Sequence, residues 1–171
     1  AKRAGFSYAI LTVKHHDGYA LWPTQFGNFS TRQYMGGRDL LKPYVDACRK
    51  NGLKVGFYFS QRDWHYPGYC TMEGFDWKQA PNAGQTKDPA DNQKDWQAYY
   101  AYTLGQLREI LTRYGKIDVL WFDGIGWNGI TDLKAGQAYA WIRELQPGII
   151  IDDRWGDDIK GDFRTVECVW P

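Results

Sequence analysis

Charge of one sign, cysteine and long apolar runs are all scarce in this sequence of 171 residues. The formal net charge is +1 and no run of basic residues occurs, so the electrostatic footprint of a nucleic-acid-binding protein is missing. The three cysteines are too few and too widely spaced for a disulfide scaffold or a CxxC metal site. No apolar segment approaches the roughly 20 residues of a membrane-spanning helix. We therefore expect neither a nucleic-acid partner nor a membrane span.

Aromatic residues are abundant instead, at 17% of the chain, with nine tryptophans. Many stand among polar residues and glycine, as in "DWHYPGY", "WFDG" and "DRWG". Aromatic rings with polar neighbours suit a flat, weakly amphipathic ligand such as a sugar ring. Filling of a wide core by large side chains explains the same composition equally well.

Four near-continuous apolar runs of strand length alternate with helical patterns, which predicts parallel strands joined by helices. The predicted strands are Tyr8–Val13, Leu53–Phe59, Ile117–Phe122 and Gly148–Ile151. The predicted helices cover Arg38–Asn51, the segment from the Asp88 cap to Gly115, and about Thr131–Leu145.

The connections are strongly asymmetric. Helix-to-strand connections are minimal, whereas the segments after the strands are long and polar (14–37, 60–87, 123–130 and 152 onward). Active sites of β/α barrels lie on such loops; an open doubly wound sheet usually binds at one switch point instead. The fold class predicted is therefore α/β, a parallel TIM-type barrel of which only about half is present. Because the chain starts without methionine in an apparent helix end and stops in an apparent strand, we expect residues 1–171 to be one partial (β/α)8 domain, truncated at both ends and open at an edge.

Two carboxylates follow strand-like segments and suggest glycoside hydrolysis. Asp123 is the first charge after "IDVLWF", and Glu167 stands among apolar neighbours in "TVECVW". A retaining glycosidase needs a carboxylate nucleophile and a second carboxyl group about 5 Å away as acid/base. The alternatives are that Asp123 only caps a turn and that Glu167 forms a salt bridge with Arg154.

Two of the three histidines, His15 and His16, stand side by side just after the first predicted strand. On an extended chain, adjacent side chains point in opposite directions, and no further Cys or His cluster completes a metal site. Neutral imidazoles hydrogen-bond well to vicinal hydroxyls, so these histidines are predicted to bind a sugar. No metal or organic cofactor is expected.

With those residues in place, the chain resembles the catalytic domain of the α-L-fucosidases of glycoside hydrolase family 29 over about residues 4–168. Four motifs carry the resemblance: "LTVKHHDGYALWP", "RDLLKPYVDACRKNGLKVGFYFSQRDW", "IDVLWFDG" and "ELQPGIIIDDRWG". The resemblance implies that Asp123 is the nucleophile and that Glu167 is the acid/base. It further implies that the substrate-binding residues are His15, His16, Trp22, Tyr58, Trp121 and Arg154.

Two positions depart from the family pattern. Residues 165–167 read "TVE" rather than the "TPE"-like motif, and Asp152 stands where the family usually has asparagine.

The resemblance also implies a substrate, terminal α-L-fucose on an oligosaccharide or glycoconjugate, and a secreted, periplasmic or lysosomal location. The 171-residue chain alone is predicted to be weakly active or inactive, because half of the barrel wall is missing. Assembly of two such chains through the open edge could close the barrel wall.

Three other functions are consistent with the same residues. They are a barrel glycosidase of other sugar specificity, a catalytically inactive carbohydrate-binding fragment, and a metal-dependent hydrolase using His15 and His16.

Overall fold

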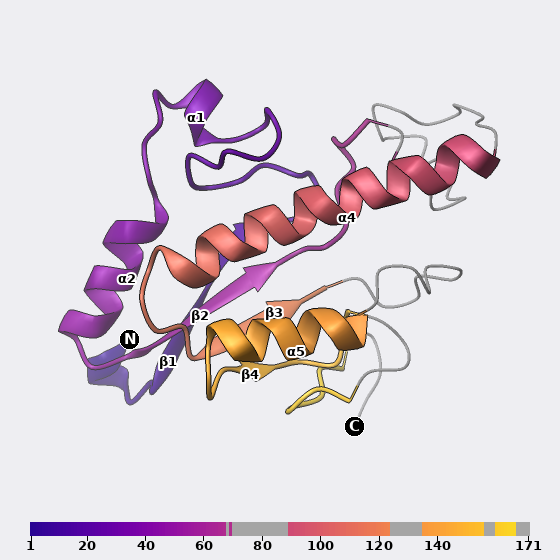
Figure 1. Cartoon of the computed structure of the whole chain (residues 1–171). Helices are drawn as coiled ribbons and strands as arrows, with labels where there is room; N and C mark the ends of the chain where they lie inside the picture. Colours follow the sequence, from indigo (N-terminus) through magenta and orange to yellow (C-terminus); the bar gives the residue numbers. More distant parts are fainter. Residues whose placement is uncertain (68, 70–88, 124–134, 156–159, 167–171) are drawn as a thin grey trace.

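The structure is a computed structural model that describes residues 1–67, 69, 89–123, 135–155 and 160–166. Its centre is one sheet of four parallel strands in the order β1-β2-β3-β4, the same order as in the chain (Figure 1). The strands are β1 (Tyr8–Lys14), β2 (Lys54–Phe59), β3 (Val119–Phe122) and β4 (Ile150–Ile151). The prediction of a parallel α/β arrangement with about half the strands of an eight-stranded barrel is confirmed.

Helices connect the successive strands. They are α2 (Leu41–Lys50) between β1 and β2, α4 (Pro89–Thr112) between β2 and β3, and α5 (Ala135–Leu145) between β3 and β4. A short 3-10 helix η1 (Lys2–Ala4) precedes β1, and a single helical turn α1 (Thr31–Tyr34), which was not predicted, lies in the loop after it. Within the described ranges, no helix combines the length and apolarity needed to cross a membrane.

The start of α2 lies three residues later than predicted because of Asp39. Its Oδ1 accepts hydrogen bonds from the backbone N–H groups of Leu41 and Lys42, at 2.9 and 3.0 Å. Two N–H groups of the first turn are thereby satisfied, which fixes where the helix begins. Pro43 falls in this first turn, as predicted. The predicted Asp88 cap and the predicted start of α5 near Thr131 lie outside the described residues.

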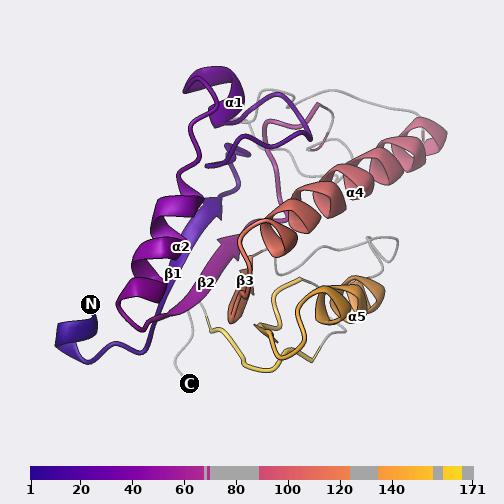
Figure 2. The same cartoon turned by 60° about the vertical axis from the view of Figure 1, so that its left-hand side comes forward.

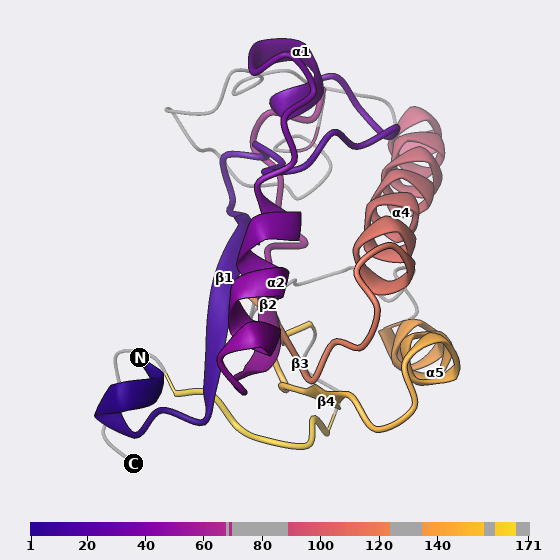
Figure 3. The same cartoon turned by 90° about the vertical axis from the view of Figure 1, so that its left-hand side faces the viewer.

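The core lies between one face of the sheet and the three helices (Figures 2 and 3). Phe57 of β2 meets Tyr44 of α2 and Tyr114 just after α4, with ring centroids 6.2 and 6.1 Å apart. Phe122 of β3 stacks on Tyr139 of α5 at 5.8 Å. Helices α2 and α5 therefore cover the same face of the sheet, and α4 leads into the same core.

The opposite face of the sheet is open in the part of the chain that the structure describes. Successive strand residues point to opposite faces, so Tyr8 and Ile150 lie on the face away from the helices. Their exposed fractions are 53% and 45%, too high for strands buried on both sides. In the described residues, the sheet is therefore covered by helices on one face only, and β1 stands at one edge of it.

Trp22 lies in the core and has no exposed surface. Its indole Nε1 donates a hydrogen bond of 2.8 Å to the Glu109 carboxylate of α4. This bond gives the buried N–H a partner and fastens the loop after β1 to the helix layer. The structure does not place Trp22 at a ligand surface, which corrects the prediction that it binds substrate.

Candidate active site

The carboxyl ends of the four strands bring together residues that are far apart in the chain. Asp123 follows β3 directly, Tyr58 lies on β2, and Arg154 follows β4. The Tyr58 hydroxyl donates to Asp123 Oδ2 at 2.5 Å, and Arg154 Nη2 donates to Asp123 Oδ1 at 2.7 Å. His16, after β1, places its Nε2 3.8 Å from Asp123 Oδ2. Both carboxylate oxygens of Asp123 are therefore engaged by groups from neighbouring strands.

These contacts keep Asp123 ionised. Burial of the carboxyl group opposes its charge, but the hydrogen bond from Tyr58 and the charge of Arg154 outweigh that cost, with a smaller contribution from His16. The pKa of Asp123 consequently falls below its ordinary value. Its side chain remains 20% exposed, whereas that of Arg154 is only 7% exposed. The arrangement is an accessible anion with a buried counter-ion, as a carboxylate nucleophile requires.

The two histidine rings lie on the same side of the chain, so the expectation that they point in opposite directions is wrong. Strand β1 ends at Lys14, and the chain then turns, with the Gly18 N–H donating to the His15 carbonyl at 3.0 Å. The rings of His15 and His16 consequently lie with centroids 4.4 Å apart. His15 also stacks on Tyr58 at 5.5 Å and an interplanar angle of 8°. Both imidazoles thus join the group around Asp123.

The orientation of His16 is fixed by Ser60, a fully buried residue just after β2. His16 Nδ1 and Ser60 Oγ are 2.6 Å apart, and Ser60 Oγ also donates to the Arg62 carbonyl at 2.9 Å. Which of these two atoms donates depends on the tautomer of His16. With Nδ1 engaged by Ser60, Nε2 is the ring nitrogen that faces Asp123 and the site.

The same residues fit a divalent metal ion poorly. His15, His16 and Asp123 have potential ligand atoms within 4.8 Å of one another. The guanidinium of Arg154 already neutralises Asp123 and would repel a second cation. Hydroxyl binding suits the geometry better.

A buried ion pair between Lys14 and Asp63, which the sequence did not reveal, supports the histidine turn. Lys14 Nζ lies 3.4 Å from Asp63 Oδ2, and both side chains are almost completely buried. Asp63 also accepts a 2.7 Å hydrogen bond from Tyr102 of α4. Gly18 has φ +84°, and a Cβ there would lie 2.1 Å from Asp63 Oδ1. The "KHHDG" segment therefore needs glycine at this position, and the ion pair ties the loops after β1 and β2 together.

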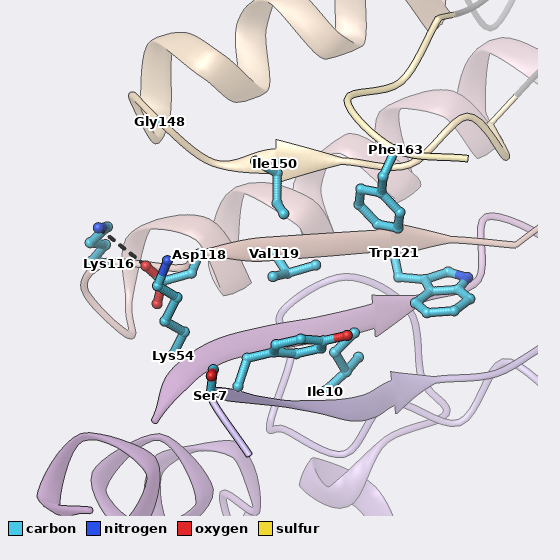
Figure 4. Close-up of a pocket in the computed structure, with 11 residues that line it drawn as sticks. Ser7, Ile10, Lys54, Lys116, Asp118, Val119, Trp121, Gly148, Ile150 and Phe163 are labelled. Carbon is cyan, nitrogen blue, oxygen red and sulfur yellow. Dashed lines mark ion pairs between the residues drawn. The ribbon is translucent and has the colours of Figure 1, made fainter. Parts of the chain in front are cut away.

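Trp121 lies on the open face of the sheet near the ends of the strands (Figure 4). Its ring meets Phe163 edge-on at 6.0 Å. Both residues line a cavity of about 430 Å³ that runs along this face past Tyr8 and Ile150. Asp123 and the histidines do not line this cavity. Among the predicted site residues that the structure describes, Trp121 alone borders this cavity. Glu167, the predicted acid/base, lies outside the described residues.

Asp152, at the end of β4, supports the strand that carries Asp123. Its Oδ1 accepts a 2.9 Å hydrogen bond from the backbone N–H of Phe122. The side chain has no exposed surface, and Oδ2 has no hydrogen-bond partner among the described residues. Burial raises the pKa of Asp152 to about 7, so this carboxyl group holds its proton at mildly acid pH.

We predict that Asp152→Asn stabilises the protein at alkaline pH. The carboxyl group ionises near pH 4 in the unfolded chain but near pH 7 in the fold, so its cost to folding is absent below pH 4 and grows until pH 7. Relative to the natural sequence, the free energy of unfolding of the variant should rise by about 1–3 kcal/mol between pH 4 and pH 8. Urea denaturation at several pH values measures it.

The matched control is Asp46→Asn, at an exposed carboxylate on α2 paired with Lys42. It should change the unfolding free energy by less than about 1 kcal/mol at either pH. A difference between Asp152→Asn and the natural sequence that stays constant from pH 4 to pH 8 would show that Asp152 does not titrate as described.

The sequence and the fold both match one family. The family model for α-L-fucosidase covers residues 1–171. A putative α-L-fucosidase 1 of Oryza sativa subsp. japonica is 32% identical, over 94% of this chain and 28% of its own length. The tissue α-L-fucosidase of Bos taurus is 29% identical, over 92% of this chain and 31% of its own length.

Solved structures agree. The α-L-fucosidase isoenzyme 1 of Paenibacillus thiaminolyticus superposes with a TM-score of 0.81 at 41% identity, covering 100% of this chain and 42% of that one. The α-L-fucosidase AlfC of Lactobacillus casei, in complex with its α-L-fucose product, gives 0.75 at 30% identity, covering 98% of this chain and 54% of that one. The chain thus spans less than a third of those curated relatives and about half of these structures, and it belongs to the α-L-fucosidase family, glycoside hydrolase family 29.

Proposed function

We propose that the protein containing this chain is a retaining exo-α-L-fucosidase, which releases terminal α-L-fucose from an oligosaccharide or glycoconjugate. The observation that carries the proposal is the Asp123 carboxylate, held between Tyr58 at 2.5 Å and Arg154 at 2.7 Å with one edge of the side chain open. A carboxylate that is ionised, oriented and accessible can attack an anomeric carbon.

In the proposed reaction, Asp123 attacks C1 of the fucose ring and forms a covalent glycosyl-enzyme intermediate. Glu167 protonates the glycosidic oxygen as the leaving group departs. Water, deprotonated by the same glutamate, then attacks C1 and releases fucose with its original anomeric configuration. The reaction needs no redox step, and Glu167 alone changes role, acting as an acid in the first half and as a base in the second.

The residues around Asp123 are proposed to bind the sugar. His16 offers Nε2 to a ring hydroxyl because Ser60 occupies its other nitrogen. His15, stacked on Tyr58, offers a second imidazole beside the first. Trp121 supplies an aromatic surface at the end of β3. The buried guanidinium of Arg154 keeps Asp123 charged until its oxygen bonds to C1 of the sugar.

We predict that Asp123→Asn abolishes hydrolysis, lowering kcat by about 10³-fold or more because the amide is a poor nucleophile. The assay compares 4-nitrophenyl α-L-fucoside with the matching galactoside, in the complete gene product that contains this sequence. The natural protein should turn over the fucoside and leave the galactoside almost untouched. Asp46→Asn, which changes a carboxylate on α2 far from the strand ends, should keep full activity.

Preference for the galactoside would indicate a barrel glycosidase of other specificity. Fucose binding without hydrolysis, unchanged by Asp123→Asn, would identify a carbohydrate-binding module instead. Inactivation by chelators would support the metal-dependent alternative. The secreted, periplasmic or lysosomal location stays a prediction from the family resemblance.

We further propose that the 171-residue chain alone self-associates through its open face. Tyr8 and Ile150 expose large apolar side chains there, and no strand pairs with the outer edge of β1 in the part of the chain that the structure describes. A second copy of the chain could cover both features, as the other half of a barrel would.

The prediction is a mass of twice 19.8 kDa in sedimentation at about 100 μM, a concentration at which weak self-association is populated. Ile150→Lys should return the chain to the monomer because it places a charge on the apolar face. Met35→Lys, at a 42% exposed residue in the loop after β1, is the control and should not change the mass. A monomer at this concentration would contradict the proposal.

A further inference from the structure

The backbone around Asp123 is held by a side chain that no motif singles out. Gln61 lies two residues after β2 and is fully buried. Its Oε1 accepts a hydrogen bond of 3.0 Å from the backbone N–H of Asp123. Its Nε2 donates to the backbone carbonyl of Arg154 at 2.8 Å, with a longer contact of 3.5 Å to the Trp155 carbonyl. One amide group thus links the two residues whose side chains form the central ion pair.

The orientation of this amide follows from its partners. A backbone N–H requires an acceptor and a backbone carbonyl requires a donor, so only one placement of Oε1 and Nε2 satisfies both. Gln61 is itself anchored, because the Tyr99 hydroxyl of α4 donates to its backbone carbonyl. Among the described residues, the titratable residues joined to Gln61 by hydrogen bonds are Asp123, Arg154 and Tyr99. An anchored donor–acceptor pair fixes the spacing between the ends of β3 and β4.

We propose that Gln61 is a positioning residue for the fucosidase reaction, setting the relative placement of Asp123 and Arg154 through their backbones. This inference rests on the proposed function. The amide bonds to the backbone of Asp123 and Arg154, not to the side chains that meet in the site. It acts by holding the nucleophile and its counter-ion in the geometry in which Arg154 Nη2 lies 2.7 Å from Asp123 Oδ1. Small displacements of a reacting group cost large factors in rate.

The test uses two near-isosteric variants, Gln61→Met and Gln61→Glu, in the complete gene product. Gln61→Met removes both hydrogen bonds and should lower kcat by roughly 10- to 100-fold while KM changes by less than about threefold. Gln61→Glu distinguishes positioning from simple destabilisation. When protonated, the introduced carboxyl group has one donor and one acceptor, like the amide; when ionised, it can only accept and opposes the Arg154 carbonyl.

Burial raises the pKa of a carboxyl group, so the introduced glutamate should be protonated at pH 5 and ionised at pH 8. The kcat of Gln61→Glu should therefore lie within about threefold of the natural value at pH 5. The ratio of the two kcat values should fall at least about tenfold by pH 8. Gln146→Met and Gln146→Glu are the matched controls. The Gln146 side chain also bridges backbone groups of two elements, accepting from Ile117 N–H and donating to the Leu111 carbonyl. It lies at the opposite end of the strands and should change neither kcat nor the pH profile.

Hydrogen exchange separates failure of this inference from failure of the proposed function. The Asp123 backbone amide should exchange at least about tenfold faster in Gln61→Met and at its natural rate in Gln146→Met. That comparison needs no turnover, so it remains decisive even if the natural protein hydrolyses no fucoside, a result that would overturn the proposed function alone. Unchanged exchange at Asp123, or a kcat ratio for Gln61→Glu that is flat from pH 5 to pH 8, would overturn the role of Gln61.

Discussion

The contact between Asp123 and Arg154 is the interaction on which the site depends. A carboxylate that is only 20% exposed pays a desolvation cost for its charge, and without compensation it would hold a proton and lose its nucleophilicity. The guanidinium at 2.7 Å and the Tyr58 hydroxyl at 2.5 Å reverse that tendency. Because Arg154 is almost completely buried, solvent and salt screen this pair much less than an exposed one.

Parallel topology explains why such a contact can form. Tyr58, Asp123 and Arg154 come from three consecutive strands whose carboxyl ends share one edge of the sheet. The register irregularity in β1 between Thr12 and Lys14, together with the turn at Gly18, brings the histidines to the same edge. The helices pack on one face of the sheet and leave the carboxyl ends of the strands free for a ligand. The polar side chains of the site are therefore gathered at these strand ends.

The sequence predicted the alternation of strands and helices because each strand is a nearly continuous apolar run and each helix has a clear apolar period. Asp123 could be assigned to the strand ends for the same reason, whereas the site roles of Tyr58 and Arg154 were predicted only from the family motifs. Trp22 could not be placed correctly, since proximity to the histidine motif does not reveal that its indole is bound to Glu109, 87 residues away. Gln61 lies inside the second family motif, but nothing there distinguished it from its neighbours, because its partners Asp123 and Arg154 lie 62 and 93 residues further on. Interactions between distant loops are set by tertiary packing, which local patterns do not encode.

In the proposed reaction Asp123 bonds covalently to the sugar, and trapping that bond is the most direct test of the mechanism. A 2-deoxy-2-fluoro-α-L-fucosyl reagent slows breakdown of the intermediate, so peptide mapping by mass spectrometry can locate the adduct in the complete gene product. One fluorofucosyl group is expected on the peptide that contains "WFDG", with fragmentation placing it on Asp123. An adduct on another residue, or continued turnover with no adduct, would contradict it.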